Sequence, residues 1–195
     1  MEKVRTKDDL ARYYEKALKY MVSDTDFQRW LGQEARDKVI RYSDLQRYSS
    51  IQELLPEQKD YRIVLTEWKR NVGHWCCLLR YGDVIEWFDS YGTAPDGELR
   101  FVPERMKHIL GEDRRILSAL LKKAKEEGFT VIYNRKKLQH EGDVSTCGRW
   151  TLSRIVTMKL GYDLDDYLKL IDKQVKGGGK PTDIVVIDLI PMPQE

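Results

Sequence analysis

The sequence has few cysteines, few histidines and no long apolar segment. Its 195 residues include three cysteines and three histidines, with neither a CxxC pair nor a His-x-x-x-His spacing, so we expect no zinc site and no disulfide framework. The longest mostly apolar stretch, Ile184–Ile190, is too short and too charged to cross a bilayer. No apolar core follows the basic residues of the first ten positions, as a secretory signal would require. These absences exclude membrane and secreted proteins and predict a reducing compartment.

The sequence also lacks a large excess of charge of either sign. The chain has 34 lysines and arginines against 32 aspartates and glutamates, and the resulting charge of +2 indicates no particular partner. Residues 103–137 depart from this balance with ten basic and five acidic side chains, a local charge of +5. Such an excess fits either a solvated helix face, which is the commoner case, or contact with nucleic acid.

Composition and periodicity predict one folded domain of the α+β class. Hydrophobic residues make up 41% and charged residues 34% of the chain, and its length leaves no room for two well-cored domains. Apolar residues recur at helical spacing in residues 10–21, 113–127, 147–160 and 163–174. Strands are predicted at Tyr61–Trp68, Trp75–Arg80, Val84–Asp89, Phe129–Tyr133 and Ile184–Leu189, and a flexible glycine-rich loop at residues 176–181. The central strands are apolar on both faces, which favours a mixed or mostly antiparallel sheet with helices on both sides.

A β-hairpin is predicted to pair a histidine with a carboxylate. Two apolar runs flank Tyr81-Gly82, and if these two residues form the loop, His74 faces Asp89 across the hairpin. Directly opposed residues share a face of the sheet and have Cβ atoms about 4.5–5.5 Å apart. Such a contact fixes the histidine tautomer and supports the protonated ring. The alternative is an ordinary histidine–carboxylate pair at the end of a sheet.

The cysteine at position 147 opens a predicted helix, with Ser145 or Thr146 as the N-cap. A thiol in the first turn lies at the positive end of the helix macrodipole, which favours the thiolate. The N–H groups of Cys147 and Gly148 are placed to stabilise an oxyanion beside the sulfur. Gly148 has no Cβ, and we expect this to leave room for a substrate.

Chemistry at Cys147 requires a base, without which a structural cysteine is the simpler interpretation. His140 has no evident carboxylate to orient it, and His108 lies in a predicted helix where a structural role is expected. His74, with its predicted carboxylate partner, is the better candidate. Gln139, in the loop before the cysteine, can bring a neutral amide donor to the same oxyanion.

The order of these motifs resembles the adenovirus-protease and Ulp1-type family of cysteine peptidases. The motifs are Gly73-His74-Trp75, then Trp87-Phe88-Asp89-Ser90-Tyr91-Gly92, then Gln139 ahead of Thr146-Cys147-Gly148. The resemblance is closest over roughly residues 60–160. Residues 38–45 and 181–186 also look like family members encoded by large DNA viruses and virophages.

This resemblance implies a papain-like cysteine proteinase fold, with the nucleophile at the N-terminus of a buried helix. It implies Cys147 as nucleophile, His74 as base, Asp89 as the residue that orients His74, and Gln139 as oxyanion donor. Trp75 is expected beside a narrow substrate groove, and such enzymes often cleave after small residues, frequently Gly-Gly.

The resemblance also implies an organisation and a biological setting. We expect one peptidase domain over residues 1–195, with a helical N-terminal region (1–56), a catalytic core (60–160) and a C-terminal helix and strand (161–195). The leading hypothesis is a thiol endopeptidase that cleaves capsid or core precursors during virion maturation, in the virion and the interior of the host cell. We expect no metal and no cofactor for the chemistry itself, and no membrane partner.

The sequence is compatible with more than one activator and more than one function. DNA, bound through residues 103–137, or a peptide is a candidate activator. A disulfide-bound activating peptide is not expected, because Cys76 and Cys77 lie in a predicted buried strand. The rival functions are a peptidase specific for ubiquitin or a SUMO-like modifier, an acyltransferase with the same residues, and a non-catalytic module that binds nucleic acid or capsid.

Overall fold

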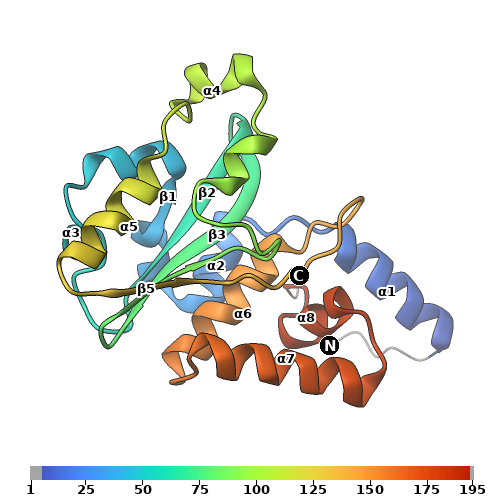
Figure 1. The fold of residues 1–195 in the computed structure, drawn as a ribbon. Coiled ribbons are helices and arrows are strands. Elements are labelled where there is room, and N and C mark those ends of the chain that lie inside the picture. The colour runs from blue at the N-terminus through green and yellow to red at the C-terminus, as the bar shows by residue number, and fades with distance from the viewer. Residues whose placement is uncertain (1–5, 194–195) are drawn as a thin grey trace.

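The chain folds around a mixed sheet. The computed structural model describes residues 6–193, and within that range five strands lie in the order β1-β2-β3-β4-β5 (Figure 1). The antiparallel centre consists of β2 (Tyr61–Lys69), β3 (Val72–Tyr81) and β4 (Val84–Phe88), and the edge strands β1 (Val39–Arg41) and β5 (Thr130–Tyr133) run parallel to their neighbours. The prediction of an α+β fold with a mixed sheet is confirmed.

Helices cover both faces of the sheet, as predicted. The short turn η2 (Tyr42–Arg47), α3 (Ile51–Leu54) and α5 (Ile116–Glu126) lie on one face, and α6 (Cys147–Lys159), α7 (Leu164–Gly178) and α8 (Thr182–Leu189) lie on the other (Figure 1). The remaining helical elements are α1 (Lys7–Lys19), α2 (Asp24–Leu31), η1 (Gln33–Lys38), η3 (Gly97–Phe101) and α4 (Glu104–Leu110). Among the helices that the structure describes, none combines the length and apolarity needed to cross a membrane.

Successive side chains of β3 point to opposite faces of the sheet and pack into two separate cores. Cys76 and Leu78 pack with α5, whereas Cys77 and Leu79 pack with α6, including its Trp150. All three cysteines are free thiols, and the two on β3 are fully buried. Because neighbouring residues of a strand point to opposite faces, the two adjacent cysteines lie in different cores.

The predicted C-terminal strand Ile184–Leu189 is wrong, because these residues form α8. A short run of β-branched residues does not distinguish a strand from a buried helix by periodicity alone. Here the run packs against α1, α6 and α7, so contacts with helices decide its conformation. The C-terminal region therefore holds two helices in place of the expected helix and strand.

Two smaller differences concern element boundaries. Helix α7 continues to Gly178, so the predicted flexible loop of residues 176–181 starts only at Gly179, whose φ of 59° ends the helix. Strand β1 lies in the region 1–56 that was predicted helical. Its three residues are too few to show a period in the sequence, and pairing with β2 holds them extended.

The β3–β4 hairpin is shifted by two residues from the predicted register. The turn is Gly82-Asp83 and not Tyr81-Gly82, and Tyr81 pairs with Val84. Gly82 has a φ of 56°, a left-handed conformation that glycine adopts without strain. Because side chains alternate with a period of two, an even shift leaves every residue on its predicted face.

A buried ion pair joins α6 to β4. Nε and Nη2 of Arg154 each lie 2.8 Å from an oxygen of the Glu86 carboxylate, and both side chains are fully buried. Burial would lower the pKa of the Arg154 guanidinium, but its hydrogen bonds to Glu86 and the charge of that carboxylate raise it. The pair fixes the position of α6 relative to the strand that leads into Asp89.

We expect Glu86→Gln to destabilise the protein by about 3–5 kcal/mol, because it leaves the Arg154 charge buried without a partner. Urea unfolding followed by circular dichroism measures the loss. The matched control is Glu34→Gln, which removes the exposed partner of Lys159 at the other end of the same helix, at an expected cost below about 1 kcal/mol. Equal costs for the two variants would contradict the role given to the buried pair.

The turn η3 carries a second buried carboxyl, Glu98, which is 1% exposed. Neither of its oxygens has a hydrogen-bond partner on any other residue that the structure describes. Burial raises the pKa of Glu98 to about 8, its own backbone N–H opposes this, and the charges of Asp89 and Asp96 add to it. Glu98 is therefore mostly neutral at pH 7.

This carboxyl makes stability fall as pH rises. The unfolded chain ionises Glu98 above about pH 4.3, whereas the folded chain keeps the proton up to about pH 8. Glu98 therefore lowers the free energy of unfolding by about 1.4 kcal/mol per pH unit across that window. We expect Glu98→Gln to remove this decline, so that its advantage over the wild type grows from pH 5 to pH 8 in urea titrations. A pH-independent difference would show that Glu98 is already ionised in the fold.

Candidate active site

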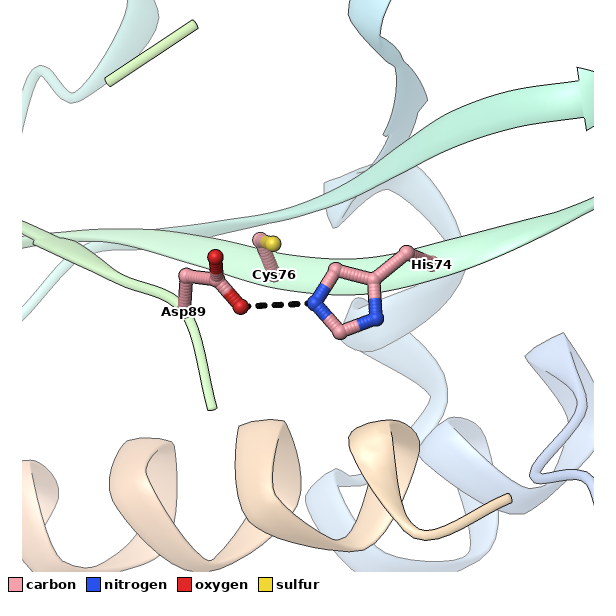
Figure 2. A group of neighbouring side chains, drawn as sticks. All are labelled: His74, Cys76 and Asp89. Atoms are coloured by element: carbon pink, nitrogen blue, oxygen red, sulfur yellow. Dashed lines mark hydrogen bonds and ion pairs between the residues drawn. The ribbon is translucent and has the colours of Figure 1, made fainter. Parts of the chain in front are cut away.

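His74 and Asp89 meet where β4 stops. His74 lies on β3, and Asp89 directly follows Phe88, the last residue of β4. The last ladder pair is Cys77–Phe88, so the next step places Cys76 opposite Asp89 and makes His74 its diagonal neighbour. Nε2 of His74 lies 2.7 Å from Oδ1 of Asp89 (Figure 2). The structure thus contains the predicted contact, through a diagonal pairing and not a direct one.

Asp89 is a buried, ionised acceptor. It is fully buried and accepts hydrogen bonds from the backbone N–H groups of Tyr91 (2.9 Å) and Thr93 (3.3 Å) and from the Thr93 hydroxyl. Burial would raise the pKa of the Asp89 carboxyl, but the hydrogen bond and charge of His74, with these donors, hold it below its usual value. Because a carboxylate only accepts, Nε2 of His74 carries a proton and Nδ1 is left for another partner.

Cys147 is the first residue of α6 and lies beside His74. Burial would raise the pKa of the Cys147 thiol. The neighbouring His74 ring and its charge, together with the backbone N–H groups of Trp75 and Gly148, hold that pKa below its ordinary value. The start of the helix and the imidazole therefore both favour the thiolate.

The pKa of the His74 imidazole shifts in the opposite direction. Burial would lower it, but neighbouring Cys76, the hydrogen bond to Asp89 and neighbouring Cys147 raise it well above its ordinary value. Burial and the charge of Asp89 raise the pKa of the Cys76 thiol as well, which keeps that thiol neutral. The negative charge that stabilises the imidazolium therefore comes from Asp89 and, once it forms, from the Cys147 thiolate.

His74, Cys76 and Asp89 also bring their donor atoms within 4.8 Å of one another, the one such group in the part of the chain that the structure describes (Figure 2). All three side chains are buried, and the bond between His74 and Asp89 already uses two of the donors. A metal ion would have to displace that bond, so we assign no metal to this group.

Tyr91 is a site residue that sequence reasoning did not single out. Its ring stacks on His74 with the ring centroids 4.7 Å apart and an angle of 21° between the planes. The observed register, extended past the last pair, places Tyr91 directly opposite His74. A prediction with the turn at Gly82-Asp83 would have found it.

Gln139 is 2% exposed and approaches the site through Tyr91. Its Oε1 accepts a hydrogen bond from Ser90 at 2.8 Å, and its Nε2 donates to the Tyr91 hydroxyl at 3.3 Å and to the Val144 carbonyl at 3.2 Å. Both amide hydrogens therefore have partners within the protein, and an oxyanion must compete with one of them. The role of Gln139 as oxyanion donor stays a prediction.

Gly148 and Trp75 lie in more crowded surroundings than expected. A Cβ on Gly148 would lie 2.5 Å from the Cβ of Val22, so the space that this glycine frees is occupied by Val22 and is not open to a substrate. Trp75 is 9% exposed, donates from Nε1 to the Val22 carbonyl at 3.0 Å and packs edge-on against Phe27. Its place beside a substrate groove stays a prediction.

His140 has a carboxylate partner that the sequence did not reveal. Its Nδ1 lies 2.7 Å from Oδ2 of Asp183, a residue of α8 that was predicted to border a strand. Thr146 is the N-cap of α6, but its hydroxyl donates to Asp183 and makes no cap bond to its own helix. His108 is exposed and pairs with Asp113 at 3.3 Å, away from the thiol.

The basic residues of segment 103–137 lie mostly at the surface, on α4, just before and on α5, and directly after β5. This placement suits a solvated face as well as a nucleic-acid contact, so DNA binding stays a prediction.

Comparison with solved structures finds a distant likeness. No family model matches the chain. Two crystal structures of the ASFV pS273R protease each resemble 78% of this chain, one with a TM-score of 0.44 at 12% identity and the other with 0.43 at 15%. The chain spans about 63% and 62% of the length of that protein in the two crystal structures. A likeness at this level assigns no activity.

Comparison with known sequences finds a much nearer relative. The uncharacterized protein V9 of the Sputnik virophage is 34% identical over 163 residues, which cover 83% of this chain and 87% of that protein. Identity of this extent, over most of both chains, shows common membership of one family. The chain therefore belongs to the family of the virophage protein V9.

Proposed function

We propose that this protein is a thiol endopeptidase with Cys147 as nucleophile and His74 as base. The observation that carries the proposal is the series Asp89–His74–Cys147, in which Asp89 and His74 are buried and Cys147 is partly exposed. In this series the pKa of the imidazole is raised and that of the thiol is lowered. The pKa values of the other two thiols, Cys76 and Cys77, are both raised. A nucleophile, a base and a group that orients the base are the requirements of covalent acyl transfer.

The first half of the reaction uses the proton held between the two residues. The thiol proton passes to Nδ1 of His74, and the Cys147 thiolate attacks the scissile carbonyl carbon. The carbonyl electrons move to the oxygen, which the N–H groups at the start of α6 and the Gln139 amide are proposed to stabilise. His74 then gives its proton to the leaving amine as the C–N bond breaks, and an acyl-enzyme remains.

The second half returns the enzyme to its starting state. Neutral His74 takes a proton from water, whose oxygen attacks the thioester carbonyl. Collapse of the tetrahedral intermediate breaks the C–S bond and releases the carboxylic acid. Asp89 stays ionised throughout, holding the imidazole with Nδ1 turned away from it.

The substrate is proposed to be a viral structural precursor, cleaved after small residues such as Gly-Gly during particle maturation. The virophage relative supports the viral setting, and the family resemblance of the motifs supports the preference for small residues. The main alternative is a peptidase specific for ubiquitin or a SUMO-like modifier. A suicide probe built on the C-terminus of such a modifier distinguishes the two functions. Labelling of Cys147 by that probe would favour a modifier-specific peptidase.

Thiolate formation can be tested without a substrate. We expect iodoacetamide to alkylate Cys147 rapidly below about pH 7, because His74 lowers its pKa from the free-thiol value of about 8.5. In His74→Ala the pH midpoint should move up toward the free-thiol value. Peptide mass spectrometry identifies the site, and the fully buried Cys76 and Cys77 serve as internal controls. A wild-type midpoint near 8.5 would contradict an activated pair.

Peptide cleavage tests the two main roles. We expect Cys147→Ala to abolish hydrolysis of a fluorogenic peptide with Gly-Gly before the reporter, with an unchanged circular dichroism spectrum. Asp89→Asn should lower kcat on the order of 10²-fold and leave residual activity, because His74 loses its orienting charge. The matched control is Cys77→Ala, which removes a buried thiol on the other face of β3 and should keep kcat. Full activity in Cys147→Ala would refute the assignment.

A further inference from the structure

A buried carboxylate on α8 ties the start of α6 to the loop that carries Gln139. Asp183 is 3% exposed and accepts hydrogen bonds from three residues in two segments of the chain. These donors are the His140 backbone N–H (2.9 Å), Nδ1 of His140 (2.7 Å), Nε1 of Trp150 (3.1 Å) and the Thr146 hydroxyl. Nothing in the reaction proposed above uses this carboxylate.

The loop that carries Gln139 is held from the other side by Ser90. The Ser90 carbonyl accepts from the backbone N–H groups of Leu138 (2.8 Å) and Gln139 (3.0 Å), and the Ser90 hydroxyl donates to the Gln139 side chain. Ser90 directly follows Asp89, so this side of the loop is fixed to the His74–Asp89 pair. Asp183 fixes the opposite side of the loop to the turn that holds Cys147.

Asp183 also changes how α6 begins. The hydroxyl of an N-cap threonine usually accepts from the first free N–H groups of its own helix. In this protein the Thr146 hydroxyl donates to Asp183 and makes no cap bond. The N–H groups of the first turn are therefore not consumed by the cap. These are the groups that an oxyanion beside the sulfur needs.

We propose that Asp183 is a positioning residue for the oxyanion site, an inference that rests on the proposed peptidase function. It withholds the Thr146 hydroxyl from the helix and aligns the Gln139 loop with the first turn of α6. It touches neither Cys147 nor His74 through any hydrogen bond above, so it acts on the oxyanion and leaves the reactivity of the thiol unchanged.

Two reagents separate these effects without a natural substrate. Alkylation by iodoacetamide needs only a thiolate, because no oxyanion forms. A Gly-Gly peptide aldehyde adds to the thiolate, its carbonyl oxygen becomes the oxyanion, and the hemithioacetal forms reversibly. The aldehyde concentration that halves the alkylation rate of Cys147 therefore measures the oxyanion site, and the rate without aldehyde measures the thiolate.

The test variant is Asp183→Asn, which keeps the shape of the side chain and removes its negative charge. We expect the half-protecting aldehyde concentration to rise on the order of 10- to 10²-fold, with the alkylation rate within about twofold of the wild type. The matched control is Asp188→Asn on the same helix, whose carboxylate pairs with Tyr14 and Lys180 at the surface and should leave both quantities unchanged.

Two results would overturn the proposal. One is an unchanged aldehyde concentration in Asp183→Asn, and the other is a parallel loss of alkylation and protection, which would show a general effect on the fold. If Asp183→Asn does not fold, Thr146→Val keeps the carboxylate and removes one donor, and it should raise the aldehyde concentration by a smaller factor; no rise would overturn the proposal. Slow wild-type alkylation with an ordinary pH midpoint would instead refute the peptidase function itself.

Discussion

A carboxylate that must stay ionised without any contact with water is the constraint on which the site depends. An isolated buried charge is strongly unfavourable, so Asp89 requires donors from every side. They come from His74 and from the turn that follows β4, and the Asn134 side chain holds the Asp89 carbonyl oxygen at 2.7 Å. Satisfying one carboxylate therefore orders the start of β3 and that turn, and the bond from Asn134 to the backbone carbonyl of Asp89 adds the segment after β5. The orientation of the imidazole is a consequence of the same requirement.

Two of the ionisable groups near His74 are mostly uncharged at pH 7. Cys76 and Glu98 are both buried nearby, yet the raised pKa of each keeps it mostly neutral at pH 7. When the Cys147 thiolate forms, one imidazolium therefore compensates two negative charges, those of Asp89 and the sulfur. The backbone N–H groups at the start of α6 offset the remaining charge. A second ionised carboxylate in this region would have no comparable donor, which is the physical reason for the neutral state of Glu98.

The sequence was sufficient to predict the contact between His74 and Asp89 but not the register that produces it. Alternation with a period of two keeps both side chains on one face for any even shift of the register, so the two-residue error in the register did no harm there. The same error hid Tyr91, which the observed register places opposite His74. Asp183 was beyond prediction, because 43 residues separate it from His140 and 37 from Thr146, and the run that follows it has no periodicity to identify a helix.

The site also requires that α6 have a defined rotation about its own axis, and apolar packing does not determine this rotation. Every residue of this helix from Gly148 to Ile155 is buried, so no single apolar stripe distinguishes one rotation from another. Two buried carboxylates do distinguish them. Asp183 accepts from Thr146 and Trp150 at the start of the helix, and Glu86 binds Arg154 further along it. Turning or sliding the helix would break charge-assisted hydrogen bonds at both places, so the direction in which Cys147 faces is set by polar contacts inside an apolar core.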